Sequence, residues 1–330
     1  MNQFWKEMGI AAVLGLFVPA VLLAAVVAIS DDSPDTPALF EERIVETEIS
    51  MQTELPAQSV QISVLNPKGE ILKMELNAYL TSVLLAEMPV SFEEEALKAQ
   101  SVVARTYIMR ASEGISKHEG AAVCTASSCC QGYLSVDDFL NKGGREQDVA
   151  HIRQLVAATD GQVLTYEGQL IEATYFSCSG GATEDAVAVW GTDVPYLQSV
   201  ESPGEEHAAH YSDTVVFSAS EFATKLGISL AGKPESWFSK TTYTEGGGVA
   251  TVKIGAEVFS GTQLRKLLGL RSTAFEITTD GDVITITTHG YGHRVGMSQY
   301  GADAMAAAGS TYPEILAHYY QGTELTIYTD

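Results

Sequence analysis

The stretch from Asn77 to Arg110 constrains the fold of this chain more than any other. It contains two runs with helical spacing, separated by Met88-Pro89. Proline ends a helix because it has no backbone N–H and clashes with the preceding turn. Glutamates at 93–95 suit the positive end of a second helix, and Ser91 with Glu94 matches a capping box. The stretch therefore predicts two consecutive helices that meet at Pro89.

The second helix is predicted to pack through one face, and the first to end in a reactive carboxyl group. The packed face consists of Ala96, Ala99, Val103, Ala104 and Tyr107, which leaves Arg105 outside it as a candidate for ligand binding. Glu87 is a single carboxylate within the apolar run 83–88. Aliphatic surroundings resist ionisation, so its pKa is expected to rise, as a general acid requires. The alternative is an ordinary surface carboxylate at a helix end.

The rest of the chain alternates between short strands and helices. Turn-forming residues predict hairpins around 66–69, 167–168, 246–248 and 280–281. Apolar periodicity predicts helices at 145–160, 218–226 and 261–268, and another that begins near Ser298. Together they predict an α+β fold, an elongated body of helices and antiparallel sheet with a cleft. Residues 205–288 could form a scaffold lobe within it.

A strongly apolar segment lies near the amino end. Residues 8–30 carry no charge, and at about 1.5 Å per residue a helix of this length spans the roughly 30 Å hydrocarbon core of a bilayer. A secretory signal peptide is the alternative. The apolar part of a signal peptide is usually shorter than this segment, and a cleavage site follows it, whereas no convincing A-x-A site follows this segment. We therefore expect a single transmembrane helix that is not removed.

The flanks of this segment predict its orientation. Lys6 precedes it and Asp31, Asp32 and Asp35 follow it, and positive charge favours the cytoplasmic side. Residues 1–7 are thus expected in the cytoplasm, residues 31–56 as a flexible spacer, and the body outside the cell membrane. The net charge of −23 argues against nucleic acid as a partner.

Two loops carry candidate ligands. One contains His118, Cys124, Cys129 and Cys130, the ligand inventory of one structural Zn²⁺. The alternative there is a Cys124–Cys130 disulfide with Cys129 free. The other loop, HGYGHRVGMSQYG at 289–301, has glycines that permit close approach. In that loop the side chains suited to sugar hydroxyl and acetamido groups are those of His293, Gln299 and Tyr300.

Two segments resemble a known family. The run AYLTSVLLAEMPVSFEEEALKAQSVVARTY at 78–107 is similar to the signature of the stage II sporulation protein D family of lytic transglycosylases. The segment HGYGHRVGMSQYGADAMAAAGSTYPEILAHYY at 289–320 resembles that family's GHGVGMSQYGA block. The matches occur in the right order, and the resemblance covers nearly everything from about residue 57 to 330.

The resemblance implies roles for particular residues. Glu87, the glutamate of the E-M-P tripeptide, would be the catalytic acid. Tyr175, Ser177 and Ser179 would line a sugar cleft. Some relatives carry zinc, with histidine where this chain has Cys129. Arg294 stands where the family commonly has glycine, which adds a cation beside the cleft.

The implied reaction cleaves the bond between N-acetylmuramic acid and N-acetylglucosamine in peptidoglycan. Glu87 would protonate the departing oxygen and then take the proton from the muramoyl 6-hydroxyl, which closes a 1,6-anhydro ring. The resemblance further implies denuded glycan strands as substrate, septal wall remodelling and forespore engulfment during sporulation. It also implies stage II sporulation proteins P, an amidase, and M as partners.

Two other functions are open. A glycan hydrolase needs a second carboxylate, for which Glu172 and Asp185 are candidates. A non-catalytic module would bind the wall as a scaffold without cutting it.

Overall fold

Two consecutive helices meet at Pro89, as the sequence predicts. The computed structural model describes residues 59–329, with α1 at Leu76–Glu87 and α2 at Glu94–Ser112. The Glu75 side chain caps α1 by accepting hydrogen bonds from the first amides of the helix. The predicted capping box at Ser91 does not form, because the N-cap of α2 is Glu93 and its side chain makes no cap bond.

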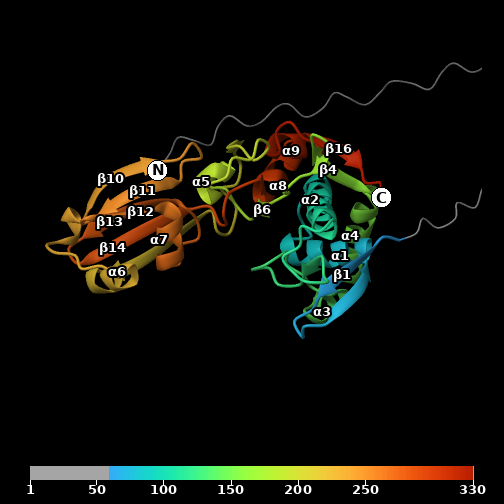
Figure 1. The fold of residues 1–330 in the computed structure, drawn as a ribbon, viewed down its shortest axis with the longest axis horizontal. Helices are drawn as coiled ribbons and strands as arrows, with labels where there is room; N and C mark the ends of the chain where they lie inside the picture. The colour runs from blue at the N-terminus through green and yellow to red at the C-terminus, as the bar shows by residue number, and fades with distance from the viewer. Residues whose placement is uncertain (1–58, 330) are drawn as a thin grey trace, which may run out of the picture. The chain divides into compact units, whose positions relative to one another are not determined.

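α2 is the central helix of the first hydrophobic core. It packs against α1, α4 (Glu146–Ala158), β4 (Gln162–Tyr166), α8 (Gln299–Ala307) and α9 (Tyr312–Tyr319) (Figure 1). Because neighbours surround the helix, buried residues lie on all of its faces. They include Arg105, which is 1% exposed. The prediction of a single packed face with Arg105 outside it is therefore wrong.

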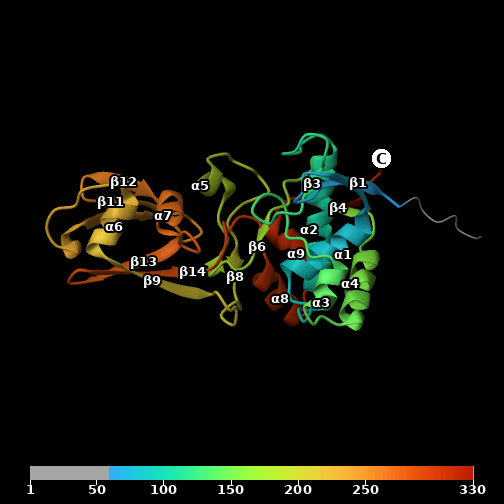
Figure 2. The same ribbon diagram turned by 90° about the horizontal axis from the view of Figure 1, so that it is seen from below.

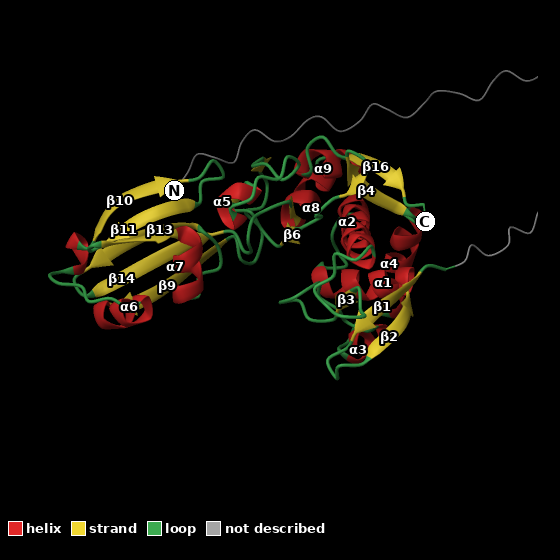
Figure 3. Cartoon of the chain, viewed as in Figure 1, coloured by secondary structure: helices red, strands yellow, loops and turns green. Residues whose placement is uncertain are grey.

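The strands described between residues 59 and 329 form six small sheets (Figure 3). β1 (Gln61–Leu65) pairs antiparallel with β2 (Ile71–Glu75), as predicted, and parallel with β3 (Val123–Cys124). β4 pairs antiparallel with β5 (Gln169–Leu170) and β16 (Glu324–Ile327). β7 (Gly181–Ala182) pairs with β8 (Glu201–Ser202), and β6 (Tyr175–Phe176) runs parallel to β15 (Met297–Ser298). Most pairs are thus antiparallel, as predicted, whereas the β1–β3 and β6–β15 pairs are parallel.

A second hydrophobic core is built from residues 215–286 alone. One sheet joins β9 (Ser212–Ser218), β14 (Val283–His289) and β13 (Ala274–Asp280), and another joins β10 (Phe238–Tyr243), β11 (Val249–Ile254) and β12 (Glu257–Ser260) (Figure 2). Helices α6 (Ala219–Leu226) and α7 (Gly261–Leu268) begin with capping boxes and bury one face each. The predicted scaffold lobe at 205–288 contains this core.

The chain enters and leaves this second core at adjacent residues. Ser212 pairs with His289 at the end of the β9–β14 ladder. The amide of Gly290 then donates a hydrogen bond of 2.8 Å to the carbonyl oxygen of Tyr211. Residues 212–289 are thus connected to the remaining chain through two neighbouring strands. Short elements complete the fold, namely α3 (Val136–Asn141), α5 (Ala186–Trp190) and a 3₁₀ turn at Pro234–Ser236.

The fold class and the localisation expected from the sequence need correction. They included a single-pass membrane helix at residues 8–30 with a cytoplasmic amino end, and these residues lie outside the described part of the chain. Among residues 59–329 no helix combines the length and apolar character needed to cross a bilayer. The longest helix named here, α2, carries charges such as Glu95, Lys98 and Arg105. The described residues form an α+β fold, and the single-pass localisation expected from the sequence is not supported by them.

Candidate functional site

A cavity of about 600 Å³ lies at the carboxyl end of α1. Residues from α1, from the loop after β3, from β6 and from the loop before β15 line it. Its size and its mixture of polar and aromatic side chains are typical of ligand sites. Among the residues that line it are Glu87, Cys129, Cys130, Gln131, Glu172, Tyr175, Phe176, Ser177, Trp190, Tyr291, His293 and Gln299.

Glu87 is the last residue of α1 and is half-buried at the cavity wall. The backbone N–H of Gly132 donates a hydrogen bond to its Oε1. A Cβ atom at position 132 would lie 2.8 Å from that oxygen. Only glycine therefore allows the amide to approach the carboxyl group so closely. The loop after β3 thus fixes one oxygen of Glu87 and leaves the other available to a ligand.

The hydroxyl group of Tyr175 lies beside this carboxyl group. Burial raises the pKa of Tyr175 well above its ordinary value, and the negative charge of Glu87 raises it further. Tyr175 consequently keeps its proton at neutral pH. It can donate a hydrogen bond to a ligand or to Glu87.

The segments around Ser177 and His293, which are far apart in the sequence, are hydrogen-bonded along their length. β6 pairs with β15, and the backbone N–H and carbonyl oxygen of Cys178 both bond to Tyr291. A Cβ atom at Gly180 would meet the Gly290 nitrogen at 2.7 Å, and one at Gly290 would meet the Ser179 oxygen at 2.5 Å. The glycines therefore let two loops pack backbone to backbone. The sequence predicts that these glycines let a ligand come close to the backbone. In the structure they are required because the two loops pack against each other.

His293 projects from these paired loops and is neutral at neutral pH. Burial, and next the positive charge of Arg265, lower its pKa to about 4. Its Nδ1 accepts a hydrogen bond from the Val295 amide, so Nε2 carries the proton. The ring lies against the rings of Phe176 and Trp190, with centroids 5.6 and 5.7 Å away. His293 can therefore offer one N–H donor among aromatic surfaces.

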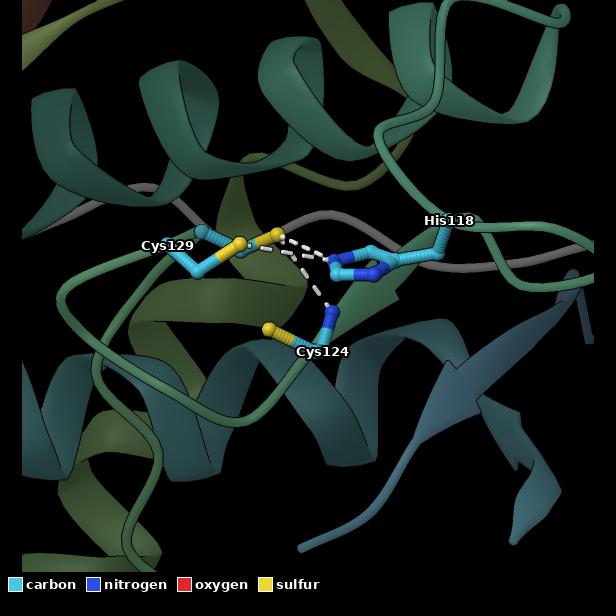
Figure 4. Close-up of side chains that lie close together, drawn as sticks. His118, Cys124 and Cys129 are labelled. Carbon is cyan, nitrogen blue, oxygen red and sulfur yellow. Dashed lines mark hydrogen bonds between the residues drawn. The ribbon is translucent and has the colours of Figure 1, made fainter. Parts of the chain in front are cut away.

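The predicted metal ligands converge in the structure. One ligand atom from each of His118, Cys124, Cys129 and Cys130 lies within 4.8 Å of all the others. Figure 4 shows the His118 ring turned toward the thiols, with Nε2 3.3 Å from Cys130 Sγ and 3.6 Å from Cys129 Sγ. Neighbouring ligand atoms around a tetrahedral zinc ion lie roughly 3.3–3.8 Å apart, so the four residues fit this metal. All four cysteines are free thiols, so the alternative disulfide is not formed.

Comparison with known proteins gives consistent matches. The family model described as stage II sporulation protein matches residues 67–166. The stage II sporulation protein D of Bacillus amyloliquefaciens is 42% identical over 76% of this chain and 74% of its own. That of Bacillus subtilis is 37% identical over 99% of this chain and 96% of its own. The chain belongs to the stage II sporulation protein D family. The amidase enhancer of Bacillus subtilis is 32% identical over 76% of this chain and 40% of its own.

Within this stage II sporulation protein D family member, the cavity brings together most of the predicted site residues. Glu87, Tyr175, Ser177, His293 and Gln299 all line it, as do Cys129 and Cys130 of the thiol cluster. The family match at 67–166 contains Glu87 and the cluster, whereas the two paired loops lie beyond it. The Bacillus subtilis relative, aligned over 99% of the chain, extends the family assignment to those loops.

Three predicted ligand-binding residues lie elsewhere. The Arg105 guanidinium donates to the carbonyl oxygens of Val156 and Gln162 within the core. Ser179 is fully buried, and its amide and hydroxyl both donate to the Glu205 carboxylate. The Tyr300 ring packs against those of Phe92 and His207. These three residues hold the fold around the cavity and are not on its wall.

The cavity also includes residues that sequence reasoning missed. Gln131 directly follows the thiol cluster, and Tyr291 stands inside the glycine-rich loop, so their positions beside recognised motifs could have indicated them. Trp190 ends α5 and remains 42% exposed. An exposed tryptophan in a cavity is a common platform for a sugar ring, yet its surrounding sequence carries no motif.

Proposed function

We propose that this chain is a lytic transglycosylase that cuts the glycan strands of peptidoglycan. The main support is the position of Glu87. The Gly132 amide holds its Oε1 at the wall of a cavity that His293 and Gln299 also line. Family membership supports the same function. In the proposed reaction Glu87 protonates the glycosidic oxygen between N-acetylmuramic acid and N-acetylglucosamine. As a carboxylate it then takes the proton from the muramoyl 6-hydroxyl, whose oxygen bonds to C1 and closes the anhydro ring.

Other cavity residues have roles that follow from their chemistry. Protonated Tyr175 beside Glu87 is a donor for a sugar oxygen or for the carboxylate that forms after proton transfer. Neutral His293 supplies an N–H donor. The exposed rings of Trp190 and Tyr291 offer apolar faces for sugar rings. A sugar that these groups hold in a fixed orientation loses less entropy on reaching the transition state, so the reaction is faster.

A glycan hydrolase is the second candidate, because Glu172 also lines the cavity. Its carboxylate lies 3.9 Å from Arg110 and is 44% exposed. Asp185 does not line the cavity, and its Oδ1 accepts a hydrogen bond from the Ser199 amide. A hydrolase requires a second carboxylate as base or nucleophile. Of the two candidates, only Glu172 is placed to serve as one.

Digestion of glycan strands free of stem peptides tests the proposal. The full-length chain should release products with 1,6-anhydro ends, detected by mass spectrometry. Glu87→Gln should retain the fold and abolish product, whereas Glu172→Gln should leave product formation within a few-fold. Reducing ends in place of anhydro ends, lost in Glu172→Gln, would favour the hydrolase. Full activity in Glu87→Gln would refute the catalytic role of Glu87, whereas glycan binding without any cleavage by the wild-type chain would favour the wall-binding module.

We further propose that the cut takes place in the septal wall during sporulation, together with stage II sporulation proteins P and M. Support comes from the names of the relatives, one of which is an amidase enhancer. An amidase removes stem peptides, so a partner of that kind would supply denuded strands. Strands pretreated with an amidase should then be cut faster than intact wall. Equal rates would remove the reason for an amidase partner.

We propose that the thiol cluster binds one structural Zn²⁺. The ligands would be His118, Cys124, Cys129 and Cys130, whose donor atoms have suitable spacing. The ion would stabilise the loop that ends at Gly132, and the chemistry of cutting does not require it. Metal analysis of chain purified without chelator should find about one zinc per chain, and Cys124→Ser should lose it. A zinc-free chain of unchanged thermal stability would exclude the metal.

A further inference from the structure

An arginine of the second core lies next to the cavity wall. Arg265 belongs to α7, and its Nε donates a hydrogen bond of 3.2 Å to the carbonyl oxygen of Arg271. The same oxygen accepts a hydrogen bond of 3.1 Å from the amide of Gly292, which lines the cavity. After burial, the positive charge of Arg265 is the next cause that lowers the pKa of the cavity residue His293. Both contacts place the Arg265 guanidinium group at the edge of the cavity.

Most donors of this guanidinium group are unused. Arg265 is half-buried, but in the described part of the chain it forms no ion pair, and its Nη1 and Nη2 have no hydrogen-bond partner. Two other arginines near these loops differ, because Arg271 pairs with Asp213 and Arg294 pairs with Glu184. The chain has 42 acidic and only 19 basic residues. A half-buried cation without a carboxylate partner is therefore unexpected, and a ligand carboxylate would supply the missing countercharge.

The unused donors have the geometry that a carboxylate needs. Nη1 and Nη2 form the end of a planar fork, which can bind both oxygens of one carboxylate through charge-assisted hydrogen bonds. The base of the fork is fixed, because the Arg271 guanidinium lies 4.9 Å from the centre of the Tyr291 ring and pairs with Asp213. The carbonyl oxygen that accepts from Arg265 is thereby held in place. A donor group fixed in this way loses little freedom when a ligand binds.

We propose that Arg265 is a specificity-determining residue that binds the lactyl carboxylate of a muramoyl residue. This carboxylate is free only where no stem peptide is attached. On a strand that carries a peptide, the same carbon belongs to a neutral amide with a single carbonyl oxygen. Arg265 therefore distinguishes the two forms by charge and by the number of acceptor oxygens. The inference rests on the proposed function in taking a glycan with muramoyl residues as ligand, but binding does not require Glu87 to cut.

Two tetrasaccharides separate recognition of the carboxylate from recognition of the sugar. Both consist of alternating N-acetylglucosamine and N-acetylmuramic acid. One has free lactyl carboxylates, and the other has lactyl N-methylamides, which imitate the first bond of a stem peptide. Titration calorimetry with the full-length Glu87→Gln chain measures both affinities without cleavage. We expect the free acid to bind roughly tenfold more tightly, and this preference should shrink at high salt because ions screen the attraction.

Arg265→Gln removes the charge and the fork but keeps an N–H donor. It should lower the affinity for the free acid about tenfold and leave the affinity for the methylamide within about twofold. Lys266 provides a matched control, because it is the next residue of α7, is exposed and does not line the cavity. Lys266→Gln removes the same charge and should leave the affinity ratio unchanged. An equal fall of the ratio in both variants would overturn the inference, because net charge alone would explain it.

The outcomes separate this inference from the proposed function. Equal binding of the two tetrasaccharides, or an affinity ratio unchanged in Arg265→Gln, overturns the inference even where the wild-type chain releases anhydro products. A carboxylate preference that disappears in Arg265→Gln and persists in Lys266→Gln supports it even where no cutting is detected. Where Arg265→Gln does not fold, Arg265→Lys decides. Lysine keeps the charge but lacks the fork, so the ratio must fall in that variant as well, and a ratio kept in full overturns the inference.

Discussion

At the scale of single residues, one backbone amide determines where the Glu87 carboxyl group lies. Gly132 donates to Glu87 Oε1, and the space that a Cβ atom would need at 132 is occupied by the end of the Glu87 side chain. That end is flexible, so it can move away at little cost to folding. A methyl group at 132 would therefore displace the acid and leave the fold intact.

Gly132→Ala tests this positioning. Because a displacement of about 1 Å can cost roughly 100-fold in rate, we expect glycan cutting to fall by about that factor, with less than about 1 kcal/mol lost in unfolding free energy. Gly69→Ala is the control, since Gly69 has φ +81° and open space around it. It should cost about 1 kcal/mol and leave the rate unchanged. A fully active Gly132→Ala would disprove the positioning role.

His293 predicts a pH dependence of stability. Its pKa is about 4 in the folded chain and about 6.5 when unfolded, so the unfolded chain binds more protons between these values. The contribution of neutral His293 to the unfolding free energy is complete above pH 6.5 and declines as the pH falls to about 4. His293→Gln should flatten the fall in melting temperature over this window. Parallel melting curves for the two chains would contradict the assignment.

Residue-level signals in the sequence identified only part of the site. The apolar neighbours of Glu87 left an ordinary surface carboxylate open as the alternative, and the resemblance of the E-M-P tripeptide to a family signature singled Glu87 out. The burial of Arg105 was not recognisable, because it depends on how many elements surround α2, which no local pattern encodes. Gln131 was missed although it directly follows the thiol cluster, because its place on the cavity wall depends on how the loop after β3 folds against Glu87.

At the scale of elements, a buried ion pair links three loops. Arg294 Nη1 lies 3.0 Å from Glu184 Oε1, and both side chains are at most 2% exposed. Arg294 also donates to the carbonyl oxygens of Ala182 and Gly246. Its φ of +67° is in the region that favours glycine. The side-chain bonds compensate for this backbone conformation and connect the cavity loop to the turn between β10 and β11.

Removing one partner of this pair should be strongly destabilising. Arg294→Met leaves the Glu184 carboxylate buried without a countercharge, which costs about 3–5 kcal/mol of unfolding free energy. The double variant Arg294→Met with Glu184→Gln should recover a large part of that loss, because no charge then remains buried. Urea denaturation of both variants and of Glu184→Gln measures the coupling. Strictly additive losses would show that the pair does not act as a unit.

Elements with local signals were predicted well, and pairings between distant segments were not. α4 was recognisable from the spacing of Val149, Ile152 and Val156, and the β13–β14 hairpin from its Asp-Gly turn. The parallel pair of β6 and β15 joins segments more than a hundred residues apart. Such a pairing is selected by the whole fold and leaves no periodic pattern in either segment.

At the scale of the whole described chain, the hydrophobic side chains form two separate cores. The first contains Leu97 of α2, and the second contains Phe222 of α6 against Trp237 and Phe238. Since each core has its own buried cluster, each is expected to contribute its own cooperative unit of stability.

Calorimetry of two variants tests this separation. Phe222→Ala should lose about 3–5 kcal/mol and Leu97→Ala about 2–5 kcal/mol, because each creates a cavity in one core. The thermogram of the wild-type chain should resolve into two transitions, with each variant lowering a different one. A single transition that both variants shift equally would mean that the cores unfold together.

The hydrogen bond between Tyr211 and Gly290 gives residues 212–289 the topology of an insertion. A segment whose two ends adjoin can be lengthened, exchanged or grafted elsewhere while the path of the host backbone is preserved. Variation within residues 212–289 can therefore leave the backbone around the cavity in place, provided that the Gly246 carbonyl oxygen still accepts from Arg294. In the laboratory the same junction is a natural place to splice in a fluorescent reporter or a tether.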